Sequence, residues 1–481
     1  MTEPANEDDQ RTTMSLFRPP TIVRSAAVAL DRSLFSKTLS LAAATIADSK
    51  KIAEWRRTLQ QTRETLAIER IQIVRPHPDG ALAARGAKCL LLDPKVKVAG
   101  PETWSAVLKS AVEREELGLV PFELTLDYDY WQYEDIMDVL IPPEDRDVHD
   151  GIPSGFNVAG HVAHLNLRNA YLPYKRLIAE VILDKNPHIK TVINKTADVG
   201  TESEFRTFGY EVLAGVDDLN VELRENECVF HFDYSKVYWN SKLHGEHTRL
   251  IDMFQPGEVV CDVMAGIGPF AVPAGKRNVF VWANDYNPDS YHSLGESIKT
   301  NKVEEFVRPF NRDGRAFIRE AADSVYEAFQ NGEYAVVKLT SKEKRDLRHA
   351  VLEGKSPPEP KRFTIPATIS HFVMNLPASA ITFLPSFRGL YAGREELFAP
   401  HTTTKLPMVH VHCFAPKENG DGPILEVCAR VSAELGVEFT PGDPEEPGKA
   451  AVHNVRTVAP NKDMFCASFR VPPEVAFSPR P

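Results

Sequence analysis

The sequence predicts an α/β protein whose main domain is a Rossmann-like, doubly wound parallel sheet. Two observations predict this class. An apolar run, Val259–Cys261, leads directly into a carboxylate, two glycines and a helix start at 262–270. Further apolar runs follow at 279–283, 307–310 and 369–374, and each ends in a polar cluster. Strands that alternate with helices and end in polar side chains are typical of a parallel sheet with a site at its carboxyl edge.

The glycine loop at 262–270 indicates a site for a nucleotide-type cofactor. Its glycines, Gly266 and Gly268, allow backbone amides to approach a ligand, and the helix start offers unpaired N–H donors. Asp262 adds a negative charge that would repel a pyrophosphate, so a cationic cofactor such as S-adenosylmethionine fits better. Taken alone, the loop is equally compatible with an ordinary structural turn.

The next three strands of the predicted sheet also end in side chains suited to binding. Asp285 lies at the tip of the second strand, about 20 residues beyond the glycine loop, where an acidic residue normally holds a ribose diol. A helix is expected at 289–301. The third strand ends in Asn311–Arg315 and the fourth in Asn375–Pro377. We therefore expect four polar clusters along one edge of the sheet.

Length and cysteine usage limit the class of protein. With 481 residues, the chain can form two or three domains with buried cores. Its six cysteines are scattered, without a CxxC pair or a His/Cys cluster at ligand spacing. This pattern argues against a disulfide framework and structural zinc, predicts no metal site, and favours a reducing compartment. No apolar stretch reaches the roughly 18 residues needed to span a bilayer, so no membrane partner is expected.

The N-terminal part predicts an extension with a domain of its own. Residues 1–13 are polar and acidic, which predicts disorder, and residues 14–122 are expected to form an N-terminal domain. Residues 14–47 are basic and nearly free of acidic side chains, which resembles a mitochondrial presequence starting at Met14. We favour the alternative, the opening of a folded region. The amphipathic helices expected in this domain are 50–69 and 103–117.

Two further regions complete the predicted organisation. Residues 123–235 predict a mixed α+β domain, and residues 236–473 hold the glycine loop and the parallel sheet. A basic, proline-bearing insertion at about 342–362 is expected to be mobile, and the tail, 474–481, carries no signal for a regular element. The elements expected in the α+β domain are a strand at 156–168, a helix at 177–185, a strand at 191–194 and part of a hairpin at 211–215.

Six motifs in one order give the chain a family resemblance. They are EFRTFGYEVLAG (204–215), FDYSKVYWNSKLHGEH (232–247), DVMAGIGPF (262–270), NDYNPDS (284–290), NRDGRAFI (311–318) and MNLP (374–377). Together they resemble the class I S-adenosylmethionine-dependent methyltransferases that modify N1 of the guanosine 3′ of the tRNA anticodon, position 37. The resemblance extends from about Phe17 to Pro472. It implies an enzyme that makes 1-methylguanosine and supports reading-frame maintenance, with 123–235 recognising the tRNA and its guanosine.

Methylation of N1 of guanine requires a base, because the nitrogen lone pair becomes available only as the N1 proton leaves. A hydrogen-bonding or cationic group must also hold O6 as negative charge moves there. A carboxylate can act as the base if a partly apolar pocket raises its pKa. Glu246, just before the glycine loop, matches the base of the family. Without the resemblance, Glu246 is an ordinary surface glutamate of a helix.

The resemblance implies three more catalytic residues. Arg206 matches the arginine that contacts the target base, and its guanidinium can donate to O6 and N7 of guanine. Tyr238 matches an aromatic residue that positions the flipped nucleotide. Asn375, at a strand end before the Leu376–Pro377 turn, could align the base and the methyl donor. The alternatives are a phosphate contact or surface salt bridge for Arg206, a core tyrosine and a turn-capping asparagine.

The implied cofactor, S-adenosyl-L-methionine, is expected to lie along the strand ends. Asp285 is suited to the ribose hydroxyls and Asp313 to the adenine amino group. His247 corresponds to a position at which the family varies. In-line transfer from the sulfonium to N1 needs no covalent enzyme intermediate. The implied cofactor-binding residues are His247, Asp262, Gly266, Gly268, Asp285, Tyr286, Asp313, Gly314 and Asn375.

The expected partner is tRNA with guanosine at position 37, and the net charge of −11 requires that its basic contacts be local. Much of the excess acid lies elsewhere, at 113–116 and 443–446. The alternative for each basic residue is a solvated surface. The candidate contacts are Arg168, Lys175, Arg176, Lys185, Lys190, Lys195, Lys236, Lys242 and the run 342–348.

Two other functions remain open from the sequence. Sister enzymes of wybutosine synthesis share this scaffold but transfer the aminocarboxypropyl group of the same cofactor; the Asn-Leu-Pro motif with Arg206, Tyr238 and Glu246 favours methyl transfer. A tRNA-binding protein without catalysis is the third alternative, and the intact set of candidate catalytic residues argues against it. We expect a monomer located in the cytoplasm and the mitochondrial matrix, with the nucleus as a further site.

Overall fold

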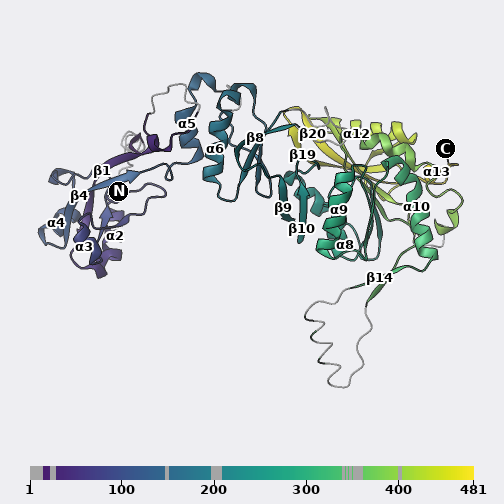
Figure 1. Cartoon of the computed structure of the whole chain (residues 1–481), viewed down its shortest axis with the longest axis horizontal. Helices are drawn as coiled ribbons and strands as arrows, with labels where there is room; N and C mark the ends of the chain where they lie inside the picture. Colours follow the sequence, from purple (N-terminus) through teal and green to yellow (C-terminus); the bar gives the residue numbers. More distant parts are fainter. Residues whose placement is uncertain are drawn as a thin grey trace. The chain divides into compact units, whose positions relative to one another are not determined.

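The computed structural model describes residues 15–21, 29–146, 151–196, 209–337, 342, 345, 349, 361–398 and 404–480. The chain divides into two compact units. The first comprises residues 1–155, 166–192 and 213–215, and the second comprises 156–165, 193–212 and 216–481. Figure 1 labels the elements of both units along the chain.

The first unit contains a four-stranded sheet of order β2-β3-β1-β4 in which neighbouring strands are antiparallel. Its core includes Phe35 and Trp131, whose indole N–H donates to the Phe35 carbonyl at 2.7 Å. The strands are β1 (Lys37–Ile46), β2 (Val74–Pro76), β3 (Lys88–Leu91) and β4 (Leu117–Leu126), and the helices are α2 (Ile52–Gln61), α3 (Gly80–Ala84), α4 (Ala106–Glu113), α5 (Tyr133–Leu140) and α6 (Lys175–Lys185). The 3₁₀ turns are Arg32–Phe35, Ser49–Lys51, Pro101–Thr103, Pro143–Asp145 and Asn169–Tyr174.

The helices predicted at 50–69 and 103–117 exist but are shorter, for local reasons. Arg63 adopts a φ of 56°, which breaks the helical path after Gln61. Ser105 accepts a hydrogen bond from the Leu108 amide at 3.1 Å and so begins α4 at Ala106. Glu115, with a φ of 56°, follows its end.

The segment at 14–47 contributes to the fold of the first unit. Its described part includes β1, which pairs with β3 on one side and with β4 on the other. Ala43 and Ala44 of this strand are fully buried. This placement supports the interpretation that the segment opens a folded region. The predicted domain boundary at residue 122 falls inside the ten-residue strand β4. No turn signal in the sequence separates the residues before and after this position.

The segment predicted as one strand at 156–168 is instead a hairpin, so that prediction was wrong. The strands β5 (Asn157–Ala159) and β6 (Val162–Leu165) are antiparallel, and Gly160 turns the chain with a φ of 53°. A side chain at Gly160 would lie 2.6 Å from the Glu222 carbonyl oxygen. With β7 (Thr191–Lys195) and β8 (Tyr210–Gly215), these strands form a sheet of order β5-β6-β7-β8, through which the division between the units passes.

The second unit is built on an eight-stranded sheet of order β13-β12-β11-β16-β17-β20-β19-β18. The strands β13, β12, β11, β16 and β17 are parallel, and β20 is antiparallel to both β17 and β19. The predicted parallel sheet is therefore confirmed, with an antiparallel extension. The strands are β11 (Val259–Asp262), β12 (Phe280–Asn284), β13 (Val307–Phe310), β16 (His371–Met374), β17 (Met408–Pro416), β18 (Thr440–Pro441), β19 (Lys449–Ala459) and β20 (Lys462–Arg470).

Helices cover both faces of this sheet (Figure 1), as in a doubly wound fold. The helices α8 and α9 pack on each other, whereas α10 and α12 both pack on the 3₁₀ segment Ala380–Phe387. The core includes Trp282, Phe372 and Phe387, all fully buried. The helices are α7 (His244–Ile251), α8 (Ala271–Lys276), α9 (Pro288–Asn301), α10 (Gly314–Gln330) and α12 (Gly422–Leu435), with 3₁₀ turns at Ser241–Leu243 and Glu395–Phe398.

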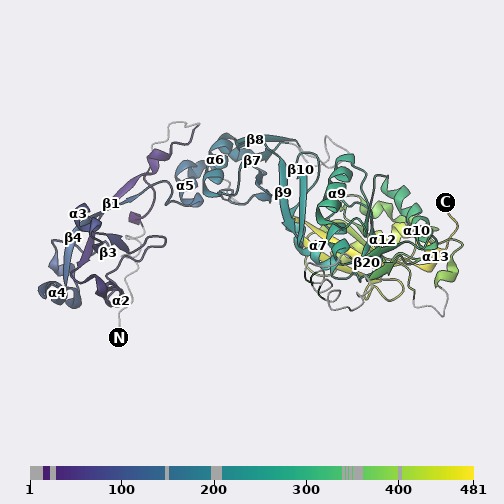
Figure 2. The same ribbon diagram turned by 60° about the horizontal axis from the view of Figure 1, so that its bottom comes forward.

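Two hairpins accompany the large sheet. The strands β9 (Asn220–Glu225) and β10 (Cys228–Asp233) are antiparallel, and Figures 1 and 2 place them beside α9. The Asn301 side chain at the end of α9 accepts from the Val229 amide and donates to the Val229 carbonyl. The second hairpin joins β14 (Tyr334–Val336) to β15 (Arg362–Thr364). Most of the predicted insertion at 342–362 lies outside the described residues.

The tail contains an element that the sequence analysis missed. Helix α13 (Pro473–Ala476) begins with proline at its first position, where a missing N–H costs nothing. The carbonyls of Val475 and Ala476 accept from Gly389 and Tyr391, and Arg480 pairs with Asp323 at 2.8 Å. The described part of the tail is therefore docked on the second unit.

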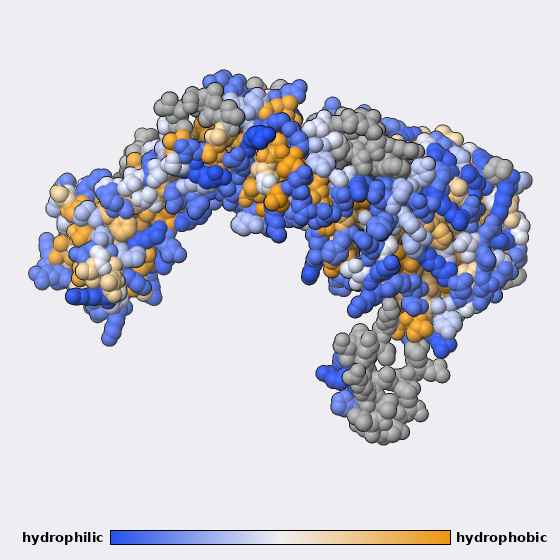
Figure 3. Space-filling model, viewed as in Figure 1, coloured by the Kyte–Doolittle hydropathy of each residue, from blue (hydrophilic) through white to orange (hydrophobic). Residues whose placement is uncertain are grey.

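The hydropathy of the surface agrees with the charged content of the sequence, 26%. Hydrophilic residues cover most of the face seen in Figure 3, and the apolar areas on it are small and separate. None of the described helices combines the length and the apolar character that crossing a membrane requires.

Candidate active site

The two loop glycines perform different tasks after β11. Gly266 has a φ of 55°, and a side chain there would meet nothing within 4 Å, so its backbone faces open space. Gly268 has a φ of 95°, and a Cβ atom there would lie 2.8 Å from both Leu294 and Val272. Gly266 thus leaves the backbone accessible to a ligand, whereas Gly268 allows the loop to pack against α8 and α9.

Asn284, buried at the end of β12, ties three strand ends together. Its Nδ2 donates to the carbonyls of Val263 and Arg312 at 3.0 Å each, and its Oδ1 accepts from the Arg312 amide at 3.0 Å. Val263 follows β11 and Arg312 follows β13, so the Asn284 side chain fixes the distances between the carboxyl ends of β11, β12 and β13. The sequence analysis quoted Asn284 within a motif but assigned it no role.

We expect Asn284→Ala to destabilise the protein by about 2–4 kcal/mol, because three buried backbone groups would lose their partner. Urea unfolding of the full chain, followed by tryptophan fluorescence, measures this. Replacement of the exposed Asn311, which donates to the carbonyls of Asp285 and Tyr286 at 2.7 and 3.0 Å, is the matched control with a smaller expected loss. Equal losses in both variants would contradict a special role for Asn284.

Asp285 lies next to the glycine loop, as predicted. Its carboxylate accepts from the Gly266 amide at 2.7 Å and from the Asn287 amide at 2.9 Å. Burial raises the pKa of Asp285 to about 6, although both amides favour the charged form. Tyr286, beside it, is half-exposed. The carboxylate therefore stands at the accessible edge of the sheet, and its contact with a ribose stays a prediction.

Asp262 is fully buried beneath the loop, and neither carboxylate oxygen receives a well-aligned hydrogen bond from the described residues. Burial and then the charge of Asp285 raise its pKa to about 8, while the nearby His412 and the Met264 amide act in the opposite direction. A buried carboxylate without a partner is costly when charged. A cationic ligand would supply the missing charge, so this site fits the sulfonium and ammonium of S-adenosylmethionine.

Asp313 and Gly314 form the start of α10. Asp313 Oδ1 accepts from the amides of Arg315 and Ala316 at 3.0 Å each, so this oxygen caps the helix. A side chain at Gly314 would lie 3.0 Å from Phe383 and 3.2 Å from Val263. The predicted bond to the adenine amino group would therefore use the other oxygen of Asp313.

Glu246 on α7 is buried in an ion cluster rather than exposed on a helix surface. Arg249 Nε donates to Oε2 at 2.7 Å, Arg249 Nη2 donates to Oε1 at 2.8 Å, and His412 Nε2 donates to Oε1 at 2.7 Å. Burial alone would raise the pKa of Glu246, but the hydrogen bonds and charges of Arg249 and His412 hold it well below the usual range. The expectation of a raised pKa was wrong, because the pocket is lined by cations.

The cluster leaves one acceptor position on Glu246. A carboxylate offers about four lone-pair sites, and Arg249 and His412 occupy two on Oε1 and one on Oε2. The side chain nearest this second oxygen across the sheet is His453, whose Nε2 is 3.9 Å from Oε2 and which is 49% exposed. Oε2 is therefore the oxygen that can accept another proton.

His412 on β17 connects Glu246 to the strand end that carries Asn375. Its Nδ1 lies 3.3 Å from the carbonyl oxygen of Met374, the residue before Asn375. The strands β16 and β17 are parallel, with Met374 beside Val411, so His412 and Asn375 lie at the same edge. The predicted residues Glu246 and Asn375 are thus joined through one imidazole. The sequence analysis missed His412, whose signal was the alternation His410–His412 on one face of a strand.

Three predicted site residues remain: Arg206 and Tyr238, predicted to be catalytic, and His247, predicted to bind the cofactor. Arg206 lies outside the described residues. Tyr238 is partly buried in the loop before α7, and Asn240 donates to its hydroxyl at 3.3 Å. His247 is buried against Phe270 of the glycine loop, with ring centroids 4.8 Å apart, and its Nδ1 is 2.5 Å from Glu225. The roles of these residues stay predictions.

Among the described residues, Glu246, His412 and Cys466 place potential metal-ligand atoms within 4.8 Å of one another. Metal ligands must be deprotonated. Burial lowers the pKa of His412, but Cys466 and the Glu246 carboxylate outweigh burial and raise this pKa to about 10. Arg249 also occupies the carboxylate with two hydrogen bonds. This group is therefore better described as a closed hydrogen-bond cluster than as a metal site.

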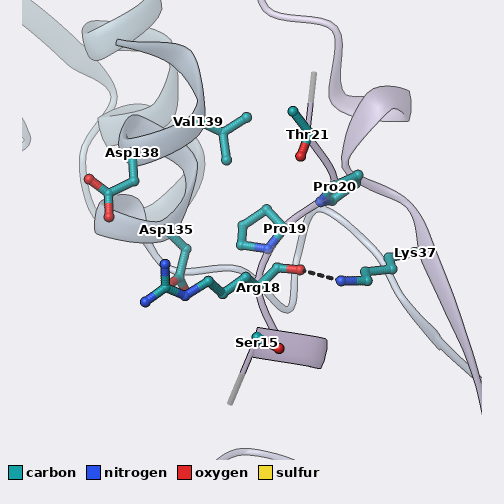
Figure 4. Close-up of a pocket in the computed structure, with 9 residues that line it drawn as sticks. All are labelled: Ser15, Arg18, Pro19, Pro20, Thr21, Lys37, Asp135, Asp138 and Val139. Atoms are coloured by element: carbon teal, nitrogen blue, oxygen red, sulfur yellow. Dashed lines mark hydrogen bonds between the residues drawn. The ribbon is translucent and has the colours of Figure 1, made fainter. Parts of the chain in front are cut away.

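A cavity of about 920 Å³ in the first unit is a different feature (Figure 4). In it, Lys37 donates to the Arg18 carbonyl at 2.9 Å. Its carboxylates are engaged, because Asp135 pairs with Arg70 and Asp138 with Arg146. The cavity contains none of the predicted site residues, and both of its lining carboxylates are already paired with arginines. It is lined by Ser15, Arg18, Pro19, Pro20, Thr21, Lys37, Asp135, Asp138 and Val139.

Comparisons with known proteins agree with this site. A family model described as the TRM5/TYW2 methyltransferase domain matches residues 221–334, and a TYW2 N-terminal domain model matches 134–218. Solved structures with a similar fold include Trm5b from Pyrococcus abyssi (TM-score 0.54, 20% identity, 90% of this chain and 99% of that one) and aTrm5 in complex with tRNALeu (TM-score 0.58, 18% identity, the same coverage).

Full-length relatives are much closer in sequence. The tRNA (guanine(37)-N(1))-methyltransferase of Neurospora crassa is 57% identical over 97% of this chain and 96% of its own length. That of Fusarium vanettenii is 55% identical over 99% and 100%, and that of Schizosaccharomyces pombe is 44% identical over 93% and 95%.

The parallel sheet, the glycine loop and the acidic strand ends, together with the matching methyltransferase-domain model, identify a class I S-adenosylmethionine-dependent methyltransferase. Within this class, the chain belongs to the tRNA (guanine(37)-N(1))-methyltransferase family.

Proposed function

We propose that this protein transfers the methyl group of S-adenosylmethionine to N1 of guanosine 37 in tRNA and so forms 1-methylguanosine. The near-complete coverage of relatives named for this reaction supports the proposal. The observation that carries it is the placement of Glu246, whose carboxylate is joined through His412 to the strand end that bears Asn375. The modified base would support maintenance of the reading frame.

In this mechanism, Glu246 Oε2 accepts the N1 proton of guanine as the new bond forms. The cofactor, when bound, supplies an electrophilic methyl group on sulfur. N1 becomes strongly acidic as it gains the methyl group, so a carboxylate with a low pKa is a sufficient base. Asp262 would hold the cationic part of the cofactor, and Asp285 its ribose. We assign Arg206 to O6 and Tyr238 to the flipped base, as the family resemblance implies.

The aminocarboxypropyl transferases of wybutosine synthesis are the second candidate, because a model named for their N-terminal domain matches residues 134–218. The relatives that share 44–57% identity over almost the whole chain favour methyl transfer.

Mass spectrometry of nucleosides distinguishes the candidates. We expect tRNA with guanosine 37, incubated with the protein and methyl-labelled cofactor, to yield labelled 1-methylguanosine. A tRNA with adenosine at position 37 is the control and should give no labelled guanosine. An unlabelled, heavier nucleoside would identify aminocarboxypropyl transfer. Binding of tRNA without a product would identify a protein without catalysis.

We also propose that the protein acts as a monomer in the cytoplasm and the mitochondrial matrix, with the nucleus as a further location. The basic composition of residues 14–47 supports the mitochondrial part. The tRNA contacts that we propose include the exposed Lys190 and Lys242; by contrast, Lys185 donates to the Tyr128 carbonyl at 2.5 Å and is engaged within the first unit.

A further inference from the structure

We propose that His412 is a positioning residue that holds the Glu246 carboxylate and the Asn375 turn in a fixed relation. This inference rests on the proposed function. His412 Nε2 is 2.7 Å from Glu246 Oε1, and its Nδ1 is 3.3 Å from the Met374 carbonyl oxygen. One rigid ring therefore contacts both the predicted base and the residue before Asn375.

Both contacts require a hydrogen on the ring nitrogen, because a carboxylate and a carbonyl can only accept. The raised pKa of His412 means that the imidazolium carries both hydrogens at neutral pH. The side chain is fully buried, so no water competes for either bond. The bridge is consequently charge-assisted at the end that holds Glu246.

Arg249 cannot perform the same task. It holds Glu246 with two hydrogen bonds, but it lies three residues further along the same helix. Its two bonds to Glu246 stay within α7, and its further contact is with Cys466 on β20, which is two strands away from β16. His412 comes from β17, the neighbour of β16 in the sheet. It therefore locates the base relative to the strand end at which the methyl donor is expected.

The bridge also determines which oxygen of Glu246 reacts. Arg249 and His412 together saturate Oε1, whereas Oε2 retains an acceptor position. Without His412, Oε1 would also have an open acceptor position, so protonation could be shared between the two oxygens. A displacement of about 1 Å in a reacting group can cost about a hundredfold in rate. A smaller displacement of Glu246 should therefore still lower the rate measurably.

Two substitutions break the bridge at different ends. In His412→Asn the amide nitrogen takes the position of Nδ1 and can still reach the Met374 carbonyl, but the contact with Glu246 is lost. In His412→Gln the amide nitrogen takes the position of Nε2 and keeps that contact, but the contact with Met374 is lost. We expect each to lower kcat about tenfold or more, with KM for tRNA within about twofold of the native value.

The pH profile provides a readout that loss of structure alone would not move. The titratable and charged groups around Glu246 are Arg249 on α7, His410 and His412 on β17, His453 on β19 and Cys466 on β20. Loss of the His412 charge removes one of the groups that lower the pKa of Glu246. The acid limb of kcat should therefore move to higher pH in His412→Asn and less in His412→Gln, which keeps a donor.

His410→Asn is the matched control. His410 is buried two residues earlier on the same strand and contacts Ser468 at 2.8 Å and His371 at 3.0 Å; it feels the charge of Glu246, but these two contacts form no part of the bridge to Met374. Native kcat in either His412 variant would overturn the inference, as would equal losses in His410→Asn and both His412 variants. A higher kcat in a His412 variant would also overturn the inference, because it would show that the basicity of Glu246, and not its position, limits the rate. A native protein that makes no 1-methylguanosine would instead refute the proposed function.

Discussion

Glu246→Gln is expected to reduce methyl transfer at least about a hundredfold while S-adenosylmethionine still binds, since losing a general base typically costs 10²–10⁴-fold. Glutamine fills the same space but cannot take up the N1 proton. The single acceptor position left on Oε2 is the structural reason for this expectation. Single-turnover methylation of tRNA measures the rate, and calorimetry measures binding of the cofactor.

Stability must be measured alongside the rate. Removing one partner from a buried ion pair costs about 3–5 kcal/mol, because the other charge stays buried. Arg249 and His412 would both lose the anion between them in this variant. Glu258→Gln is the matched control, since Glu258 faces His371 at 3.5 Å at the amino end of β16. Unchanged turnover in Glu246→Gln, with native turnover in the control, would remove Glu246 from the mechanism.

The strand-end site was largely predictable from the sequence, because it depends on local patterns. Apolar runs that stop at a polar residue gave β11, β12, β13 and β16 to within two residues. Parallel strands bring those ends to one edge by geometry alone. The predicted placement of Asp285 and Asn375 at this edge is therefore confirmed.

The electrostatics of Glu246 could not be predicted in the same way. Arg249 is three residues away, and an i, i+3 pair could have been read from the sequence. His412 is 166 residues away, and its contact depends on the order of strands β16, β17 and β20 in the sheet. The sign of the pKa shift followed from that long-range pairing, so the sequence predicted the residue but not its ionisation.

The errors in the fold have a similar origin. The run at 156–168 is apolar enough for one strand, and only the positive φ of Gly160 turns it into a hairpin. The tail, 474–481, was expected to carry no regular element, yet proline suits the first turn of α13. In both places, a residue that is compatible with two backbone conformations decided the outcome, and tertiary contacts selected one of the two conformations.

Above about pH 8, where Asp262 is ionised, Asp262→Asn is expected to weaken binding of S-adenosylmethionine about a hundredfold. Two unit charges several ångströms apart, at an effective dielectric constant of about 20, interact by about 3 kcal/mol, and every 1.4 kcal/mol is about tenfold in affinity. Asp262 is buried and lacks a well-aligned hydrogen bond from the described residues, and only the charge of His412 and the Met264 amide stabilise its ionised form. S-adenosylhomocysteine shares the amino acid group but lacks the sulfonium charge, and its affinity should fall less.

The same substitution should stabilise the ligand-free protein at alkaline pH. The pKa of Asp262 is raised from 3.8 to about 8 on folding, chiefly by burial. A group with a raised folded pKa stabilises the protein fully below its unfolded pKa, and this contribution is lost as pH rises from about 4 to about 8. Asparagine does not titrate, so the ligand-free variant should exceed the native protein in thermal stability near pH 8 and lose that advantage near pH 5.

The affinity of the native protein for S-adenosylmethionine should rise with pH, whereas the stability contribution of Asp262 falls. Ionised Asp262 attracts a cation, so the preference for S-adenosylmethionine over S-adenosylhomocysteine should grow as pH rises towards 8. Taking the ratio of the two affinities cancels titration of their common amino group. Above about pH 8, where Asp262 is ionised, Asp285→Asn should weaken both ligands, since it removes a predicted ribose contact. A ratio that stays constant with pH in the native protein, or that is unaltered by Asp262→Asn, would show that Asp262 does not bind the sulfonium.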